Sequence, residues 1–122
     1  MLLCKTNEQW EKILTDIQSA TKEKVVLPVT VSYRIIKNQI AIEKSLMAYR
    51  MTVKEIIDKY SDGKGEISQK DNPDIFRQAY DEISIVAHEI TEANIVTVSV
   101  SEFENKDFPL SLIANLSFMI TD

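Results

Sequence analysis

Residues 27–46, LPVTVSYRIIKNQIAIEKSL, decide the fold because they fit two kinds of secondary structure. Their first half alternates apolar and polar residues like a strand, whereas their second half repeats apolar residues with a helical period. Pro28 would interrupt a central strand, since it has no backbone N–H to donate to a neighbouring strand. At the first position of a helix the same missing N–H costs nothing. We therefore predict that a helix begins at Pro28.

The helical period continues well beyond this stretch. No glycine follows until Gly63, and one apolar stripe comprises Ile35, Ile42, Leu46, Tyr49, Val53, Ile56 and Tyr60. The pattern predicts a single helix over about residues 28–60. At about 1.5 Å per residue this helix is roughly 50 Å long, whereas a compact domain of 122 residues is only about 35 Å across. The helix is therefore expected to kink or to project beyond its own domain.

The same helix carries a second apolar stripe, about 150° around its axis from the first. Its members are Ile36, Ile40, Met47 and Met51. One stripe can face the core of the chain, but the other would be exposed in a monomer, and a contiguous exposed apolar strip usually marks association. We predict a homo-oligomer with this second stripe as its interface. The alternative is that the first and last helices of the chain cover the long helix from both sides.

The segments before and after the long helix are easier to interpret. Residues 1–5 are apolar enough for a short strand, and Thr6 and Gln9 have the spacing of a capping box. The helix that they introduce is expected over about residues 7–22, where apolar side chains fall on one face. A polar loop over residues 61–72 follows the long helix.

The C-terminal half is predicted to begin with a helix over about residues 73–93, with proline at its first position. Residues 94–103, NIVTVSVSEF, alternate β-branched residues with Ser and Thr, which is typical of a strand. A short helix over about residues 109–120 is expected to close the chain, with a strand as the alternative. The predicted fold is α+β and mostly helical, in the order β-α-α-α-β-α, as a single domain of residues 1–122. In it the long central helix pairs with the helix over 73–93, beside a small two-stranded sheet.

Charge and composition narrow the class of function. The net charge is −5, which argues against direct nucleic-acid binding, because such binding needs a positive surface that releases counterions. The charge is uneven, +3 over residues 1–60 and −8 over residues 61–122. The apolar runs are too short to span a membrane. Cys4 is the single cysteine, which indicates a reducing compartment, and we predict a cytoplasmic protein with Cys4 as a buried structural thiol.

Motifs for catalysis, metals and cofactors are missing from the pattern of residues. The two glycines, in DGKGE, do not form a phosphate-binding loop. The single histidine lies in HEITE, residues 88–92, and a zinc protease site needs a second histidine four residues later. We interpret His88 as a surface residue. The chain is therefore predicted not to be an enzyme and to use neither a metal nor a cofactor.

Two charged surfaces remain as candidate binding sites. The first is basic and could hold a phosphate and stack a base of a nucleotide-like ligand; it comprises Tyr33, Arg34, Lys37 and Lys44. The second is an acidic face expected on the helix over 73–93, which could mimic nucleic acid for a basic host protein; it comprises Asp74, Asp81, Glu82, Glu89 and Glu92. For both surfaces the alternative is an ordinary solvated helix face.

The order of these segments resembles a family of small uncharacterised proteins encoded by phages and prophages of Gram-positive bacteria. The residues that carry the resemblance are TNEQ at 6–9, LPVTVSYRIIKN at 27–38 and the closing LSLIANLSFMI at 110–120. The resemblance implies a non-enzymatic binding protein in the cytoplasm of a bacterial host. We expect it to counter host defence, by sequestering a nucleotide-like signal or by blocking a host protein. The alternatives are a structural or assembly accessory of the virion and an acidic nucleic-acid mimic.

Overall fold

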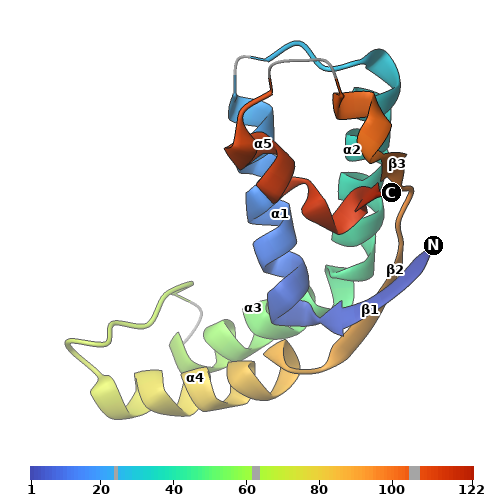
Figure 1. Cartoon of the computed structure of the whole chain (residues 1–122). Coiled ribbons are helices and arrows are strands. Elements are labelled where there is room, and N and C mark those ends of the chain that lie inside the picture. The colour runs from blue at the N-terminus through green and yellow to red at the C-terminus, as the bar shows by residue number, and fades with distance from the viewer. Residues whose placement is uncertain (24, 62–63, 105–107) are drawn as a thin grey trace.

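A computed structural model describes residues 1–23, 25–61, 64–104 and 108–122, and it confirms the mostly helical α+β class. The elements of these described residues follow one another as β1 (Leu2–Thr6), α1 (Asn7–Lys22), α2 (Val29–Ser45), α3 (Met47–Ser61), α4 (Pro73–Ala87), β2 (Ile90–Asn94), β3 (Val98–Ser99), the 3-10 helix η1 (Val100–Phe103), α5 (Leu110–Asn115), the 3-10 helix η2 (Ser117–Met119) and β4 (Ile120–Thr121). The chain forms a body, which contains every element except α3 and α4, and an arm made of those two helices (Figure 1).

The predicted single helix over residues 28–60 is wrong, because it is divided into α2 and α3 at Leu46. The backbone hydrogen bonds continue through this residue: Leu46 donates to the carbonyl of Ile42 and accepts from the N–H of Arg50, both at 2.9 Å. Leu46 is completely buried in the core. The helix therefore bends at the residue that anchors it to the body, and α3 then leaves the body, so the expected kink and projection both occur (Figure 1).

The predicted helix over residues 73–93 ends earlier, at Ala87. Asn7 holds this end of the helix: its side-chain amide donates to Val86 O in the last turn at 2.8 Å, and its N–H donates to the carbonyl of Glu89, just beyond the helix, at 3.0 Å. The next residues form β2, which pairs with β1. The strand that was predicted over 94–103 therefore begins earlier, at Ile90. Only Val98–Ser99 of the remaining stretch is a strand, and the residues after it form η1.

Two small sheets pair the N-terminal and C-terminal strands with strands that lie within residues 90–99. β1 and β2 are antiparallel, with Leu2 opposite Asn94 and Thr6 opposite Ile90, which confirms the two-stranded sheet. β3 and β4 form a short parallel pair, so the last residues of the predicted closing helix are instead a 3-10 turn and a strand.

The buried side chain of Asn38, on α2, holds the short segment that connects β2 to β3. Its Oδ1 accepts from the N–H of Val96 at 2.7 Å, and its Nδ2 donates to the carbonyl of Val96 at 2.9 Å. Asn38 is completely buried. One side-chain amide thus satisfies both backbone groups of a residue that lies between two strands, as a neighbouring strand would.

The hydrophobic core lies in the body, where α1 packs against both α2 and α5. Its fully buried large side chains include Trp10, Ile17, Ile35, Ile42, Leu46, Ile95, Leu112, Leu116 and Met119. The indole N–H of Trp10 donates to the carbonyl of Thr91 at 2.8 Å, so the polar atom of the largest core residue is also satisfied.

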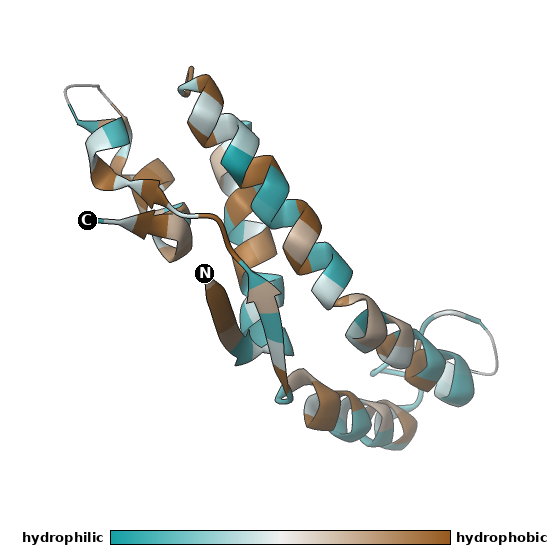
Figure 2. Cartoon of the chain, turned by 90° about the vertical axis from the view of Figure 1, so that its right-hand side faces the viewer, coloured by the Kyte–Doolittle hydropathy of each residue, from teal (hydrophilic) through white to brown (hydrophobic). Residues whose placement is uncertain are grey.

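The arm is a helical hairpin with a thin interior, in which only Ser61, Ala79 and Ala87 among the described residues of α3 and α4 are buried. Two side-chain contacts link the arm and its end to α1. The Arg50 guanidinium contacts the Glu11 carboxylate through two hydrogen bonds of 2.7 and 3.0 Å, and His88 Nε2 lies 3.6 Å from a Glu8 oxygen. In the view of Figure 2, α2 and α3 follow one another along one side of the molecule.

Candidate interaction surfaces

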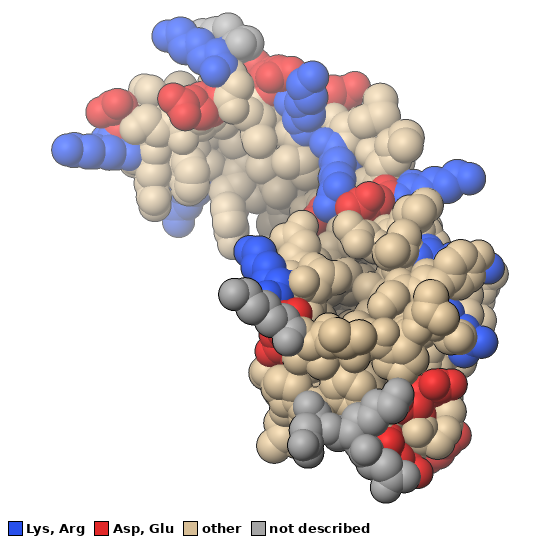
Figure 3. Space-filling view, turned by 90° about the horizontal axis from the view of Figure 1, so that it is seen from above, with Lys and Arg blue, Asp and Glu red and all other residues tan. Residues whose placement is uncertain are grey.

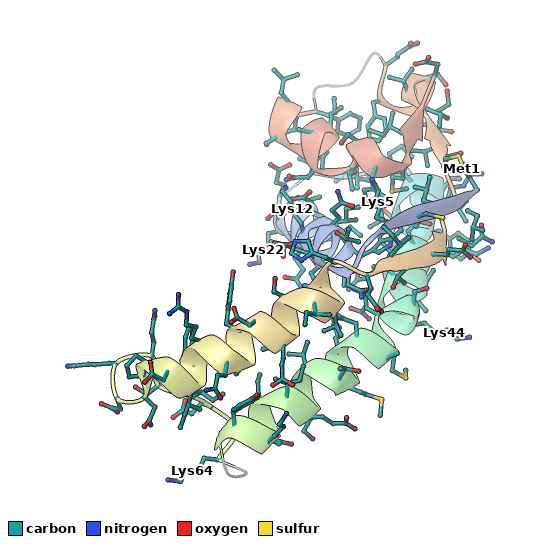
Figure 4. All side chains as sticks on the ribbon, turned by 90° about the horizontal axis from the view of Figure 1, so that it is seen from below. Met1, Lys5, Lys12, Lys22, Lys44 and Lys64 are labelled. Carbon is teal, nitrogen blue, oxygen red and sulfur yellow. The ribbon has the colours of Figure 1, made fainter. Side chains whose placement is uncertain are left out.

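The predicted basic site is an extended helix face in which one member has a structural role. Arg34 is half-buried, and its Nη1 donates to the carbonyl of Thr97 at 2.9 Å, beside the Asn38 contact. Tyr33, Lys37 and Lys44 are exposed on α2, and Lys44 extends away from the body (Figure 4). Tyr33 and Lys44 are about 16 Å apart along the helix axis. A face of this length does not enclose a small molecule, as ligand pockets do.

The second apolar stripe lies on the outside of the molecule, as the sequence predicts. Ile36, Ile40, Met47 and Met51, called the outer stripe below, are each between 56% and 61% exposed. The stripe crosses the bend at Leu46 without interruption, and Val29 and Tyr33 extend it towards the start of α2. The alternative of cover from both sides is therefore wrong for the isolated chain, since α1 and α5 leave this side of α2 open.

A shallow groove of about 550 Å³ lies over the bend. Apolar side chains of the outer stripe line it, namely Ile40, Met47 and Met51, together with charged side chains, namely Glu43, Lys44, Arg50 and Lys54. Figure 2 shows hydrophobic residues interspersed with polar ones along α2 and α3. The groove thus combines apolar area with charges of both signs, which is the composition of a protein-binding surface rather than of a small-molecule site.

The predicted acidic face is divided between two elements, because α4 ends at Ala87. Asp74, Asp81 and Glu82 lie on α4, whereas Glu89 follows the helix and Glu92 lies on β2. The prediction that all five share one helix face is therefore wrong. On the arm, basic and acidic side chains are interspersed (Figure 3).

Glu82 is engaged within the arm rather than free on its surface. Its carboxylate lies 3.1 Å from the amine of Lys59. Hydrogen bonding from the Tyr60 hydroxyl, and then from Lys59, holds the pKa of Glu82 below its ordinary value. Asp74 and Asp81 are exposed and remain available to a partner.

The residues considered for catalysis or metal binding lie on the surface and are separated. His88 is exposed, as predicted, and its Nδ1 lies 2.7 Å from the carbonyl of Ser84. The prediction of a buried Cys4 is wrong, because Cys4 is exposed on β1, 3.8 Å from a Glu92 oxygen. Across the described part of the chain, no group of three or more potential ligands could hold a metal ion. None of the described helices is long and apolar enough to cross a membrane.

The arm contains a hollow that the sequence did not indicate. It has a volume of about 300 Å³ and lies between α3, α4 and the segment before α4; Ile57, Ile67, Phe76, Ala79, Tyr80 and Ile83 provide most of its wall. The apolar stripe of α4 can be recognised in the sequence as one face of a helix. The hollow itself depends on the distance between α3 and α4, which the sequence does not reveal. Tyr80 at its rim is 62% exposed.

Comparison of the chain with models of protein families, with curated proteins and with solved structures gives no match. The resemblance to phage-encoded proteins therefore stays a prediction. The support for a function comes from the outer stripe, the arm and the positions of the charged side chains.

Proposed function

We propose that this chain is a non-enzymatic, homo-oligomeric binding protein, in which the outer stripe joins copies and the arm engages a host protein. The observation that carries the proposal is the exposure of four large apolar side chains beside a body whose core is complete without them. Burying these side chains on two copies contributes on the order of 10 kcal/mol, which is comparable with the cost of association, about 4–15 kcal/mol.

A protein partner is favoured over a nucleotide-like ligand by two features of the surface. Arg34, the best phosphate donor of the predicted basic site, is already bonded to Thr97 O. The arm, in contrast, presents an apolar hollow, and the exposed Asp74 lines a second hollow that shares Phe76 and Tyr80 with it. Asp81 is exposed on the same helix. An apolar anchor surrounded by charge is a common form of protein interface. The resemblance to phage proteins favours a host protein as the partner, in the cytoplasm of a bacterial host, and the exposed Asp74 and Asp81 favour a basic one.

Self-association is tested by measuring the mass of the chain by size-exclusion chromatography with light scattering. A multiple of the 13.9 kDa monomer is expected at micromolar concentration. Ile40→Glu is expected to give a monomer, because it places a charge in the centre of the outer stripe. Ile85→Glu is the matched control, since Ile85 is 68% exposed on the arm and Ile40 is 61% exposed. A wild-type chain that stays monomeric contradicts the proposal.

The partner is tested by retention of proteins from a bacterial extract on the immobilised chain. The double variant Asp74→Lys/Asp81→Lys is expected to weaken retention of a basic protein at least tenfold, and raised salt is expected to act in the same direction. Glu104→Lys/Asp122→Lys makes the same change of charge at exposed positions of the body and serves as control.

Two other results would redirect the assignment. A thermal shift with nucleotides that is lost on Lys37→Glu would favour sequestration of a nucleotide-like signal. Detection of the chain in purified virions would favour the assembly role.

A further inference from the structure

The outer stripe and the charges beside it are arranged symmetrically about a point between Glu43 and Lys44. Ile40 is three residues before Glu43, and Met47 is three residues after Lys44. Ile36 is seven residues before Glu43, and Met51 is seven residues after Lys44. All four apolar side chains are exposed on the same side of α2 and α3. The spacing is thus the same when read in either direction from this point.

Such a pattern has a direct meaning for two copies of one helix. When two identical helices run antiparallel about a two-fold axis, the residue at a given distance before the axis meets the residue at the same distance after it in the other copy. Ile40 then faces the partner's Met47, and Ile36 faces the partner's Met51. Glu43 faces the partner's Lys44, and this pair occurs twice because of the symmetry. Near the axis, apolar side chains therefore face apolar side chains, and acidic side chains face basic ones.

We propose that two copies of this chain pair antiparallel along the outer stripe, with the two-fold axis between Glu43 and Lys44. The inference rests on the proposed self-association and specifies its geometry. A parallel pairing in register places Glu43 opposite Glu43 and Lys44 opposite Lys44, and like charges in contact are destabilising.

The surface of the single chain is suited to this arrangement. The groove of about 550 Å³ lies at the proposed axis and is lined by both Glu43 and Lys44. Among the residues that the structure describes, ion pairs within the chain involve neither of these two side chains. Both charges are exposed, and the one side-chain hydrogen bond to Glu43 in the described part of the chain is a long one of 3.5 Å from Gln39, so both can pair with a second copy.

The same arrangement extends beyond the centre. Tyr33 is ten residues before Glu43 and Lys54 is ten residues after Lys44, so an amine faces an aromatic ring near each end. The pairing also brings Lys37 opposite the partner's Arg50. The charge of Arg50 is already compensated by its two hydrogen bonds to Glu11, which reduces this repulsion.

The first experiment exchanges the charges and measures mass by light scattering. Glu43→Lys and Lys44→Glu, each alone, create two like-charge contacts at the axis, and each is expected to weaken the dimer at least tenfold. An equimolar mixture of the two variants is expected to restore a dimer, because each new charge then faces an opposite one. The double variant Glu43→Lys/Lys44→Glu is expected to restore it as well. If the single variants associate as strongly as the wild type, the arrangement is wrong.

The second experiment uses disulfide trapping, which does not depend on charge. In a Cys4→Ser background, Ile40→Cys and Met47→Cys are mixed and treated with oxidised glutathione. A disulfide between the two different variants is expected, and Ile40→Cys alone is expected to give little cross-linked product. Efficient cross-linking of Ile40→Cys to itself would overturn the antiparallel arrangement while leaving self-association intact. A monomeric wild type would instead overturn the proposed self-association, so the two failures are distinguishable.

Discussion

The body and the arm differ in how they are stabilised, although both are mostly helical. The body buries large side chains completely, from Trp10 in α1 to Met119 near the C-terminus. The arm buries only small ones in its two helices, and its larger apolar side chains are half-exposed or line the hollow. The body is thus held by its own core, whereas the arm has unused apolar surface. A segment with few buried apolar contacts opens more easily, and it also has the most to gain from a partner.

The largest expected effect is in the centre of the body. Trp10→Ala removes a fully buried side chain and its hydrogen bond to Thr91 O. The expected loss in the free energy of unfolding is about 3–5 kcal/mol. It is measured by urea denaturation followed by circular dichroism. Tyr80→Ala in the arm is the control and is expected to cost less than about 1 kcal/mol, since this side chain is mostly exposed.

A smaller loss is expected for Asn38→Ala, which tests a polar contact of the body. The substitution leaves the N–H and the carbonyl of Val96 without the partner that they have now. The expected cost is about 2–3 kcal/mol, because buried polar groups without partners are expensive. Faster hydrogen exchange of the Val96 amide is expected as well. Gln39→Ala, on the adjacent position of α2, serves as control; equal effects of both variants would show that the amide contact has no special role.

Phe76→Ala tests how much the interior of the arm contributes to its stability. Phe76 is half-buried and lines the hollow, so the expected loss is about 1–2 kcal/mol. Hydrogen exchange measured by mass spectrometry is expected to accelerate in α3 and α4, while α1 and the first half of α2 keep their protection. Equal acceleration in α1 would mean that body and arm unfold as one unit.

The smallest effect is expected from the pH dependence of Glu82. Its pKa is lowered in the folded state from the ordinary value of 4.5, first by Tyr60 and then by Lys59. The folded chain therefore binds this proton less tightly than the unfolded chain. The resulting stabilisation is fully present above pH 4.5 and is lost as the pH falls through the folded pKa.

The measurement compares Glu82→Gln with the wild type by thermal unfolding between pH 7 and pH 3. The variant is expected to lose less stability on acidification than the wild type, by a small amount because the cluster is exposed to solvent. Asp74→Asn, on the same helix but outside this cluster, is the control. An identical pH profile for wild type and Glu82→Gln would contradict the assigned role.

Local patterns predicted the parts of the fold that depend on neighbouring residues. The capping box is present, with Gln9 N–H donating to Thr6 Oγ1 at 3.1 Å and Thr6 N–H donating to Gln9 Oε1 at 2.9 Å. The two apolar stripes of residues 28–60 were also recognisable, because helical periodicity is a property of the sequence itself.

Contacts between distant residues could not be predicted in the same way. The end of α4 depends on Asn7, and its last residues otherwise continue the helical pattern. No glycine or proline near Leu46 predicts the bend. The bend arises because the side chain of Leu46 is buried at the edge of the body. Arg34 looked like part of a basic site because its partner, Thr97, is 63 residues away.

The separation of body and arm has a consequence for the order of folding. The contact of Asn7 with Val86 closes a loop of 79 residues, whereas the contact of Lys59 with Glu82 closes one of 23. The entropy of loop closure favours the shorter one by about 1 kcal/mol. The hairpin of α3 and α4 is thus expected to close first, and its closure brings the start of α3 near the end of α4. Once the hairpin has formed, fewer flexible residues separate β1 from β2. The entropic cost of pairing these two strands, which completes the body, is therefore lower.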